Sequence, residues 1–197
     1  MNNFWNERFS TKEYVYGEEP NQFFKQELEK LKLGRILLPG EGEGRNAVFA
    51  AKIGWKVVAF DSSLEGKNKA EKLAKKNKVS IEYQIKNYED FVGETEFFDC
   101  IALIYTHMLP HNRSEYHKKL TSFLKPGGIL ILEGFSKEQI NQNTGGPRNV
   151  DMLFSKEELQ NDFESFTNLT IAEFDVILEE GQTHQGASSV IRVLGIK

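Results

Sequence analysis

The chain has 197 residues, of which 39% are hydrophobic and 27% are charged, a balance typical of one globular domain with a single core. Its 25 Lys and Arg against 29 Asp and Glu give a formal net charge of −4. The chain therefore lacks the positive field that supplies most non-specific binding to nucleic acid or to anionic membranes, and we expect neither partner.

The amino-terminal residues have neither a basic start nor an apolar run of signal-peptide length. No apolar stretch approaches the roughly 20 residues needed to cross a bilayer. Cys100 is the only cysteine, which excludes an intramolecular disulfide, so a cytoplasmic location is the expectation. The histidines and the cysteine show no tight ligand spacing, and we predict no metal.

Short runs rich in Ile, Val and Leu alternate with amphipathic stretches, the pattern of βαβ units around a mostly parallel sheet. In chain order we expect strands at residues 35–38, 56–60, 81–85, 98–104 and 129–133, and helices at residues 21–33, 46–53, 63–78 and 111–124. Gly34 is expected to end the first helix. The residues 125–128, Lys-Pro-Gly-Gly, are expected to end the fourth helix and turn the chain.

The lysine-rich segment 63–78 keeps Leu64, Ala70, Leu73 and Ala74 at helical spacing, which predicts a helix with one solvated face. Residues 136–148 are polar and rich in Asn and Gly, which predicts a mobile loop. A capping-box pattern that begins at Ser155 predicts a helix to about residue 163. Two β-prone stretches, 169–178 and 189–196, flank the segment 180–187 and predict a terminal antiparallel hairpin.

A glycine-rich turn, Gly40-Glu41-Gly42-Glu43-Gly44-Arg45, joins the first strand to the next helix. In an open α/β sheet this is where a nucleotide-like ligand binds, because glycines allow close approach and the helix start offers free N–H groups. Gly42-x-Gly44-x-x-Ala47 also satisfies the dinucleotide fingerprint. An ordinary glycine turn with solvated glutamates is a further alternative.

The negative charge of the loop distinguishes between a dinucleotide and S-adenosylmethionine as its ligand. Glu41 and Glu43 would lie beside the pyrophosphate of a dinucleotide, which is unfavourable in a partly desolvated turn. S-adenosylmethionine has no phosphate, and its sulfonium and ammonium groups tolerate acidic neighbours. Its carboxylate would find Arg45 and the amides of the loop. The turn therefore favours S-adenosylmethionine as the cofactor.

Asp61 follows the second strand at the same edge of the sheet, where an acid accepts hydrogen bonds from ribose hydroxyls. Its alternative role is to cap the next helix. Asn87, Tyr88 and Glu89 follow the third strand, and they are placed to contact an adenine ring or simply to form a turn.

These residues resemble class I S-adenosylmethionine-dependent methyltransferases, in particular the small bacterial enzymes of the tellurite-resistance and thiopurine methyltransferase type. The resemblance rests on Gly40-x-Gly42-x-Gly44 with Arg45-Asn46, on Asp61, on Phe98-Asp99 and on Leu124-Lys125-Pro126-Gly127-Gly128. The segments Trp5-Asn6-x-Arg8-Phe9 and Tyr14-Val15-Tyr16-Gly17-x-x-Pro20-Asn21 also resemble the lid of this subgroup.

The resemblance implies an α/β, Rossmann-like, doubly wound sheet of seven strands in the order 3-2-1-4-5-7-6, with strand 7 antiparallel and helices on both faces. It implies a single methyltransferase domain over residues 1–197, with a lid at residues 1–20 on a core at residues 21–197. The family has an acid two residues before the first glycine, where this chain has Leu38. The contribution of that acid would fall to Glu41, to Glu43 or to water. The expected cofactor-binding residues are Gly40, Glu41, Gly42, Gly44, Arg45, Asp61, Ser62, Asn87, Tyr88, Glu89, Ile104 and Tyr105.

Methyl transfer is an in-line displacement at a sulfonium carbon, so it depends mainly on alignment and on the exclusion of water. Aromatic rings near a sulfonium add about 1 kcal/mol each. Trp5, Phe9, Tyr14 and Tyr16 are the candidate lid rings, and their alternative role is to fasten the amino terminus to the core.

Three residues are candidates for catalysis. His107, after the fourth strand, is a candidate base or anion ligand, with a structural histidine as the alternative. His184, in the predicted hairpin, could reach the same crevice, and Arg148 could hold a substrate anion.

We expect the methyl acceptor to be a small molecule, namely a thiol, an amine, a hydroxyl compound or a chalcogen oxyanion, and the protein to be a monomer or a homodimer. The alternatives are a nicotinamide-dependent oxidoreductase and a non-catalytic S-adenosylmethionine-binding protein.

Overall fold

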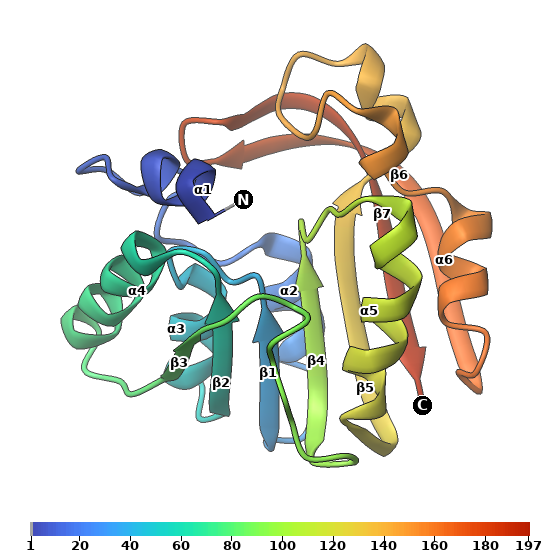
Figure 1. Cartoon of the computed structure of the whole chain (residues 1–197), viewed down its shortest axis with the longest axis horizontal. Helices are drawn as coiled ribbons and strands as arrows, with labels where there is room; N and C mark the ends of the chain where they lie inside the picture. Colours follow the sequence, from blue (N-terminus) through green and yellow to red (C-terminus); the bar gives the residue numbers. More distant parts are fainter. Residues whose placement is uncertain (1) are drawn as a thin grey trace.

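The structure, a computed structural model, describes the backbone of residues 2–197 and the side chains of residues 4–197. One sheet has the order β3-β2-β1-β4-β5-β7-β6, with β7 antiparallel to both of its neighbours (Figure 1). The predicted topology is therefore confirmed. The strands are β1 (Arg35–Pro39), β2 (Lys56–Asp61), β3 (Glu82–Ile85), β4 (Phe98–Ile104), β5 (Leu124–Phe135), β6 (Asn168–Glu180) and β7 (His184–Ile196).

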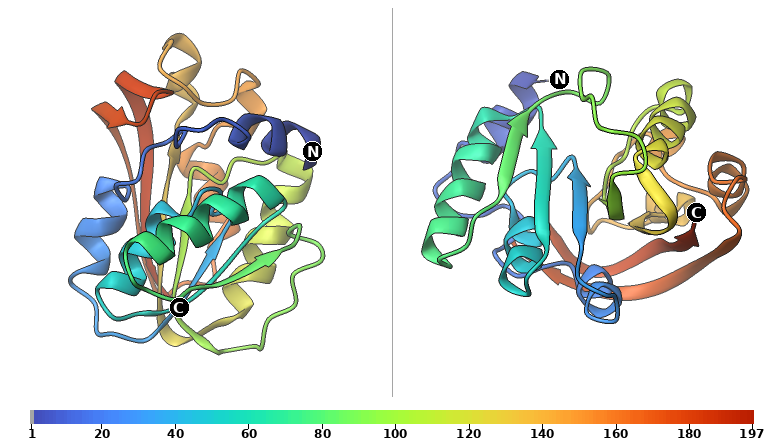
Figure 2. Two further views of the ribbon diagram at one scale, coloured as in Figure 1. Left: turned by 90° about the vertical axis from the view of Figure 1, so that its left-hand side faces the viewer. Right: turned by 90° about the horizontal axis from the view of Figure 1, so that it is seen from below.

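Helices cover both faces of the sheet (Figure 2). On one face α2, α3 and α4 pack against the sheet, and on the other face α5 and α6 do. The helices are α1 (Asn2–Phe9), α2 (Gln22–Leu28), α3 (Arg45–Lys52), α4 (Leu64–Lys76), α5 (Pro110–Ser122) and α6 (Lys156–Asp162), with short 3-10 helices η1 (Lys137–Asn141) and η2 (Val150–Met152). No helix of the described chain is long and apolar enough to cross a membrane.

Neighbouring residues of each central strand face opposite helical layers, as the pleat of a strand requires. Leu37 of β1 and Ile101 of β4 pack in the cluster with α5 and α6. Ile36 and Cys100 pack in the cluster with α2 and α3. Both faces are therefore buried, which explains why these strands read as continuous apolar runs.

The first helix is shorter than predicted, because α2 ends at Leu28. Gly34 therefore does not end it. A Cβ on Gly34 would lie 2.4 Å from Oδ2 of Asp99, which accepts a hydrogen bond from the Arg35 amide at 2.8 Å. Gly34 instead allows Asp99 to pack closely at the start of β1.

The predicted turn at residues 125–128 is wrong, because this stretch belongs to β5. Its pairing with β4 is irregular: Phe98 pairs with Leu124, but Cys100 pairs with Ile129. Gly127 has a φ of +75°, which a glycine adopts without strain. The Pro and Gly residues therefore form an irregularity within a long strand.

The terminal hairpin is confirmed, but its turn is tighter than predicted. β6 extends to Glu180 and β7 begins at His184, so these two residues pair directly across the turn. The expected loop at 136–148 is partly fixed, because it contains η1 and a buried Gln139 whose Oε1 accepts from the Ser189 amide at 2.8 Å. The capping box of Ser155 is present at the start of α6.

The solvated face of α4 is also confirmed, with Ala70, Leu73 and Ala74 buried. Leu64 is an exception, since it is 49% exposed at the first turn of the helix. A Cβ on Gly44 would lie 2.5 Å from the Cβ of Ala70, so α4 packs directly on the glycine-rich loop.

This packing can be tested by comparing two glycines. Gly44 and Gly127 both have a positive φ, of +88° and +75°, but nothing lies within 4 Å of a Cβ on Gly127. Gly44→Ala and Gly127→Ala should each lose roughly 1 kcal/mol of unfolding free energy to the left-handed backbone. Gly44→Ala should lose about 1–3 kcal/mol more through overpacking against Ala70. Urea denaturation measures both, and equal losses would contradict the packing of α4 on the loop.

Candidate active site

The glycine-rich loop between β1 and α3 is enclosed by three other parts of the chain. Gly40 and Gly42 have φ values of +63° and +61°. A Cβ on Gly40 would lie 2.5 Å from the Tyr88 hydroxyl, and a Cβ on Gly42 would lie 3.1 Å from Cζ of Phe9. Tyr88 and Phe9 therefore pack directly on the backbone of the loop, where a side chain on either glycine would collide with them.

The two glutamates of the loop have protein partners. Glu41 accepts a hydrogen bond from the Ala47 amide at 2.7 Å, and burial raises the pKa of its carboxyl group to about 7. Glu43 accepts from the Val15 amide at 2.8 Å and pairs with Lys69 at 2.7 Å. Both carboxylates therefore build the loop and its surroundings. A role for either in place of the acid missing at Leu38 stays a prediction.

Asp61 binds the same loop from the end of β2. Its Oδ2 accepts from the Gly42 amide at 3.1 Å and its Oδ1 from the Ser63 amide at 2.9 Å. Burial raises the pKa of Asp61, and these backbone hydrogen bonds oppose that shift. Ser63, not Asp61, caps α4. A carboxylate oxygen can accept more than one hydrogen bond, so Asp61 can hold the loop and also accept from a ribose hydroxyl.

Tyr88 and Thr106 flank Gly40 on its other side. The Tyr88 ring stacks on Tyr116, with centroids 5.6 Å apart, and meets Phe60 edge-on at 5.5 Å. The hydroxyl oxygen of Thr106 is buried and has no hydrogen-bond partner among the described residues. Tyr88 and Thr106 both contact Gly40, so the Thr106 hydroxyl is a candidate partner for a polar ligand at this edge. Sequence reasoning missed Thr106, although it is the second residue after the end of β4.

The other expected cofactor residues lie around this edge. Ser62 and Ile104 are half-buried beside Asp61 and Tyr105. The Asn87 side chain donates to Asp90 at 3.0 Å, and the Glu89 carboxylate accepts from Tyr116 at 3.1 Å. The side chains of Asn87 and Glu89 are therefore engaged in local turn contacts, and their part in adenine recognition stays a prediction.

A buried carboxylate, Glu180 at the end of β6, joins three distant segments. It accepts hydrogen bonds from Nδ2 of Asn21 at 2.9 Å and from Nη2 of Arg45 at 2.8 Å, and its Oε2 lies 3.4 Å from Nδ1 of His184. Burial alone would raise the pKa of Glu180, but the hydrogen bond from His184 and the charge of Arg45 outweigh it, and the pKa falls to about 2. Glu180 is therefore ionised at neutral pH.

A second buried carboxylate, Glu133 of β5, adjoins the first through Asn21. Asn21 donates to Glu133 at 2.6 Å, the Tyr105 hydroxyl donates at 3.1 Å, and Arg192 pairs with it at 2.5 Å. Tyr105 has a φ of +55°, a strained value for a tyrosine, which turns the chain at the end of β4. Sequence reasoning missed this network, because its members lie far apart in the chain. The signal available was a glutamate at the end of an apolar strand.

Arg45, expected to bind a cofactor carboxylate, already has two partners. Besides Glu180, it donates to the carbonyl oxygen of Tyr16 at 3.2 Å. It thereby connects the first residue of α3 to the amino-terminal segment. Its contact with the cofactor stays a prediction.

His107 is held at both ring nitrogens. Nδ1 lies 2.9 Å from the carbonyl oxygen of Met152, and Nε2 accepts from the Phe135 amide at 3.0 Å. Burial lowers the pKa of His107 to about 4, and its ring stacks on Phe154 at 4.6 Å. With no lone pair left for a substrate proton, this geometry favours the structural alternative for His107.

His184, by contrast, is buried where the end of β4, the hairpin and the amino-terminal segment meet. Its ring centroid is 4.6 Å from those of both Tyr16 and Tyr105. Nδ1 faces Glu180, and no hydrogen bond to Nε2 is found within the described chain. Arg148 is exposed and donates to the carbonyl oxygen of Gln142 at 2.9 Å, within its own loop. Of the three catalytic candidates, only His184 combines a position beside Tyr105, at the end of β4, with a nitrogen that is not hydrogen-bonded.

The amino-terminal segment covers the loop. Phe9 is buried against Gly42, and Trp5 stacks on Phe9 with centroids 5.4 Å apart. Tyr16 faces His184, whereas Tyr14 donates to the Lys69 carbonyl oxygen on α4 at 3.0 Å. Phe9 thus packs on the glycine-rich loop and Tyr16 packs on His184, whereas Tyr14 fastens the segment to α4.

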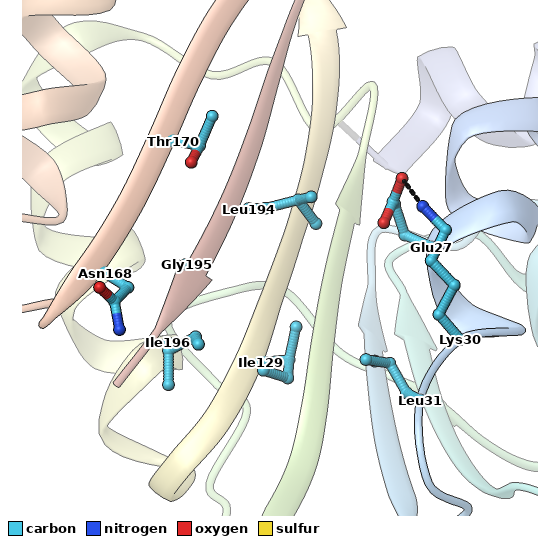
Figure 3. A pocket seen from close by; sticks show the side chains of 9 residues that line it. All are labelled: Glu27, Lys30, Leu31, Ile129, Asn168, Thr170, Leu194, Gly195 and Ile196. Atoms are coloured by element: carbon cyan, nitrogen blue, oxygen red, sulfur yellow. Dashed lines mark hydrogen bonds and ion pairs between the residues drawn. The ribbon is translucent and has the colours of Figure 1, made fainter.

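A cavity of about 230 Å³ lies at the opposite end of the sheet, away from this edge. Figure 3 shows it lined by Ile129 of β5, Leu194 and Ile196 of β7 and Leu31 after α2, with the Glu27–Lys30 ion pair at its border. None of the predicted site residues lines it.

The raised pKa of Glu41 has a consequence for stability. Because the folded state holds this proton to about pH 7 and an unfolded glutamate releases it near pH 4.5, the Glu41 contribution is full below about pH 4.5. It decreases as the pH rises to 7 and is then constant, a total on the order of 3 kcal/mol. The unfolding free energy of the native chain relative to Glu41→Gln should therefore fall between pH 4.5 and 7. Urea denaturation across this range measures it, and a pH-independent difference would contradict the assignment.

Comparisons with known proteins agree with this geometry. Residues 36–128 match a family model described as a methyltransferase domain. Over 119 residues the chain is 32% identical to glycine/sarcosine N-methyltransferase from Halorhodospira halochloris, an alignment that covers 56% of this chain and 43% of that protein. The chain thus spans less than half the length of this curated relative.

Solved structures extend the fold match over the whole chain. TehB from Haemophilus influenzae superposes with a TM-score of 0.71 at 13% identity, covering 100% of this chain and 66% of that one. The N-methyltransferase NodS from Bradyrhizobium japonicum gives 0.66 at 16% identity over 99% and 97%. A SAM-dependent methyltransferase from Methanosarcina mazei gives 0.68 at 18% identity over 91% and 98%. Residues 36–128 are therefore similar to a methyltransferase domain, and the chain shares the fold of these solved structures.

Proposed function

We propose that this protein is an enzyme that transfers the methyl group of S-adenosylmethionine to a small-molecule acceptor. The observation that carries the proposal is that the glycine-rich loop and Asp61 meet at the carboxyl edge of the sheet, where β4 ends in Tyr105 against His184. The curated relative is named for methylation of glycine and sarcosine, both small amines, which supports an acceptor of this size.

The residues around the glycine loop would hold the cofactor. Asp61 would accept hydrogen bonds from the ribose hydroxyls, and the loop amides and the Thr106 hydroxyl would pair with its other polar groups. When bound, the cofactor supplies an electrophilic methyl group on a sulfonium. Phe9 and Tyr16 of the covering segment would exclude water and place aromatic rings near the positive charge.

His184 is suited to accept the proton that a nucleophile loses. Burial lowers the pKa of His184, so its ring is neutral at pH 7. Because Nδ1 faces the ionised Glu180 carboxylate, it carries the ring proton, and Nε2 keeps a lone pair. Glu180 thus acts as a positioning residue that fixes the tautomer of His184.

The proposal is tested with the whole chain. S-adenosylhomocysteine should bind in calorimetry, and radiolabelled S-adenosylmethionine should label an acceptor from a panel of thiols, amines, hydroxy acids and oxyanions of selenium or tellurium. His184→Asn keeps a donor for Glu180 but has no basic nitrogen. It should lower kcat by about 100-fold or more and remove the acidic limb of the pH–rate profile, with unchanged S-adenosylhomocysteine affinity.

His111→Asn is the matched control, because His111 is exposed on α5. It should leave kcat and the pH profile as they are. Absence of S-adenosylhomocysteine binding would contradict the proposed function, whereas cofactor binding without transfer to any acceptor of the panel would favour a non-catalytic binding protein.

A further inference from the structure

Arg8 of α1 is a cation without an anionic partner, and it lies beside Tyr16. Its Nε atom is buried and has no hydrogen-bond partner, and no carboxylate of the described chain pairs with its guanidinium. The guanidinium carbon lies 5.7 Å from the ring centroid of Tyr16 and 5.9 Å from that of Phe4. Aromatic contacts hold the half-buried group in place, and the Tyr16 hydroxyl can accept one of its hydrogen bonds, but the Nε donor stays without a partner.

The other cations of this region differ from Arg8, because each has a carboxylate. Arg45 pairs with Glu180 at 2.8 Å, Arg192 with Glu133 at 2.5 Å, and Lys69 with Glu43 at 2.7 Å. In each of these pairs the two opposite charges neutralise one another. A guanidinium that is partly desolvated and unpaired is costly, and it is the arrangement expected where a ligand supplies the missing anion.

Arg8 lies near His184, the candidate base of the proposed site. Its neighbour Tyr16 has its ring centroid 4.6 Å from that of His184. The Tyr16 ring thus contacts both the Arg8 guanidinium and the His184 ring. Arg45 begins α3 beside the glycine loop, whereas Arg8 belongs to the segment that covers it.

We propose that Arg8 binds the anionic group of the methyl acceptor, so that the acceptor is a small molecule with a carboxylate or an oxyanion. This inference rests on the proposed function and adds the class of substrate to it. The Nε and one Nη of a guanidinium form a fork that matches two oxygens of a carboxylate or oxyanion. Because Arg8 lies on the covering segment, closure of that segment over the site would bring the anion-binding group to the acceptor.

The bonds, electrons and proton of the methyl transfer are all accounted for when Arg8 binds only the anion. The lone pair of the acceptor nucleophile forms the new bond to the methyl carbon as the carbon–sulfur bond breaks, and the electron pair of that bond stays on sulfur. If the nucleophile is an amine, its proton goes to Nε2 of His184. Arg8 takes no part in the bond changes and holds the anion away from the reacting atom.

The test measures binding to the protein saturated with S-adenosylhomocysteine. Sarcosine and acetate serve as carboxylate probes, selenite and tellurite as oxyanion probes, and dimethylamine as a matched amine without a carboxylate. At least one anionic probe should bind in calorimetry, and dimethylamine should not. Arg8→Gln should weaken the binding of that anion by about tenfold or more, and Arg8→Lys should restore part of it.

Lys12→Gln is the control, because it removes an exposed positive charge of the same segment. It should leave anion binding unchanged, and Arg8→Gln should leave S-adenosylhomocysteine affinity unchanged. Failure of every anion to bind the loaded native protein, or equal binding by native and Arg8→Gln protein, would overturn the proposal. A parallel loss of S-adenosylhomocysteine affinity would assign Arg8 to the cofactor instead. Failure of the native protein to bind S-adenosylhomocysteine would contradict the proposed function itself.

Discussion

The buried carboxylate of Glu180 is the constraint on which the candidate site depends. It is 8% exposed, and it faces an amide from the amino-terminal segment, a guanidinium from α3 and an imidazole from β7. Removing a carboxylate from water costs several kcal/mol, and only this set of donors compensates for it. The three segments are therefore held in one arrangement, because a change in any of them would leave a buried charge with fewer partners.

This constraint explains how the amino-terminal segment, the glycine-rich loop and the β6–β7 hairpin meet at one site. Asn21 links Glu180 to Glu133, which receives the hydroxyl of Tyr105 at the end of β4. The amide of Gln182 in the hairpin turn donates to the Val15 carbonyl oxygen at 3.0 Å, so the turn also contacts the covering segment. Access to the site therefore requires a movement that separates the amino-terminal segment from both the glycine loop and the hairpin.

Much of the fold could be predicted from the sequence, because local patterns specify it. Apolar runs gave the central strands, and the glycine turn and the Ser155 capping box marked helix starts. Boundaries failed where a tertiary contact decided them. Gly34 accommodates Asp99 from another strand, and the Pro-Gly-Gly stretch became part of β5 through its pairing with β4.

The residues of the candidate site also fall into two groups, those that the sequence predicted and those that only the folded chain shows. The glycines and Asp61 lie on one short stretch of sequence and could be identified from spacing. Glu133, Glu180 and Asn21 come from three distant segments, so only the folded chain shows that they meet. His107 and His184 look alike in sequence, and the structure separates them by the partners of their second nitrogen.

Hydrogen–deuterium exchange on Glu180→Gln tests the central role of this carboxylate. Loss of the charge leaves Arg45 buried without a counter-ion, a cost of about 3–5 kcal/mol. Exchange should therefore increase together in residues 14–21 and in the hairpin turn 181–187, while β1 and β4 keep their protection. Increased exchange confined to the hairpin, with the amino-terminal segment unchanged, would contradict the account.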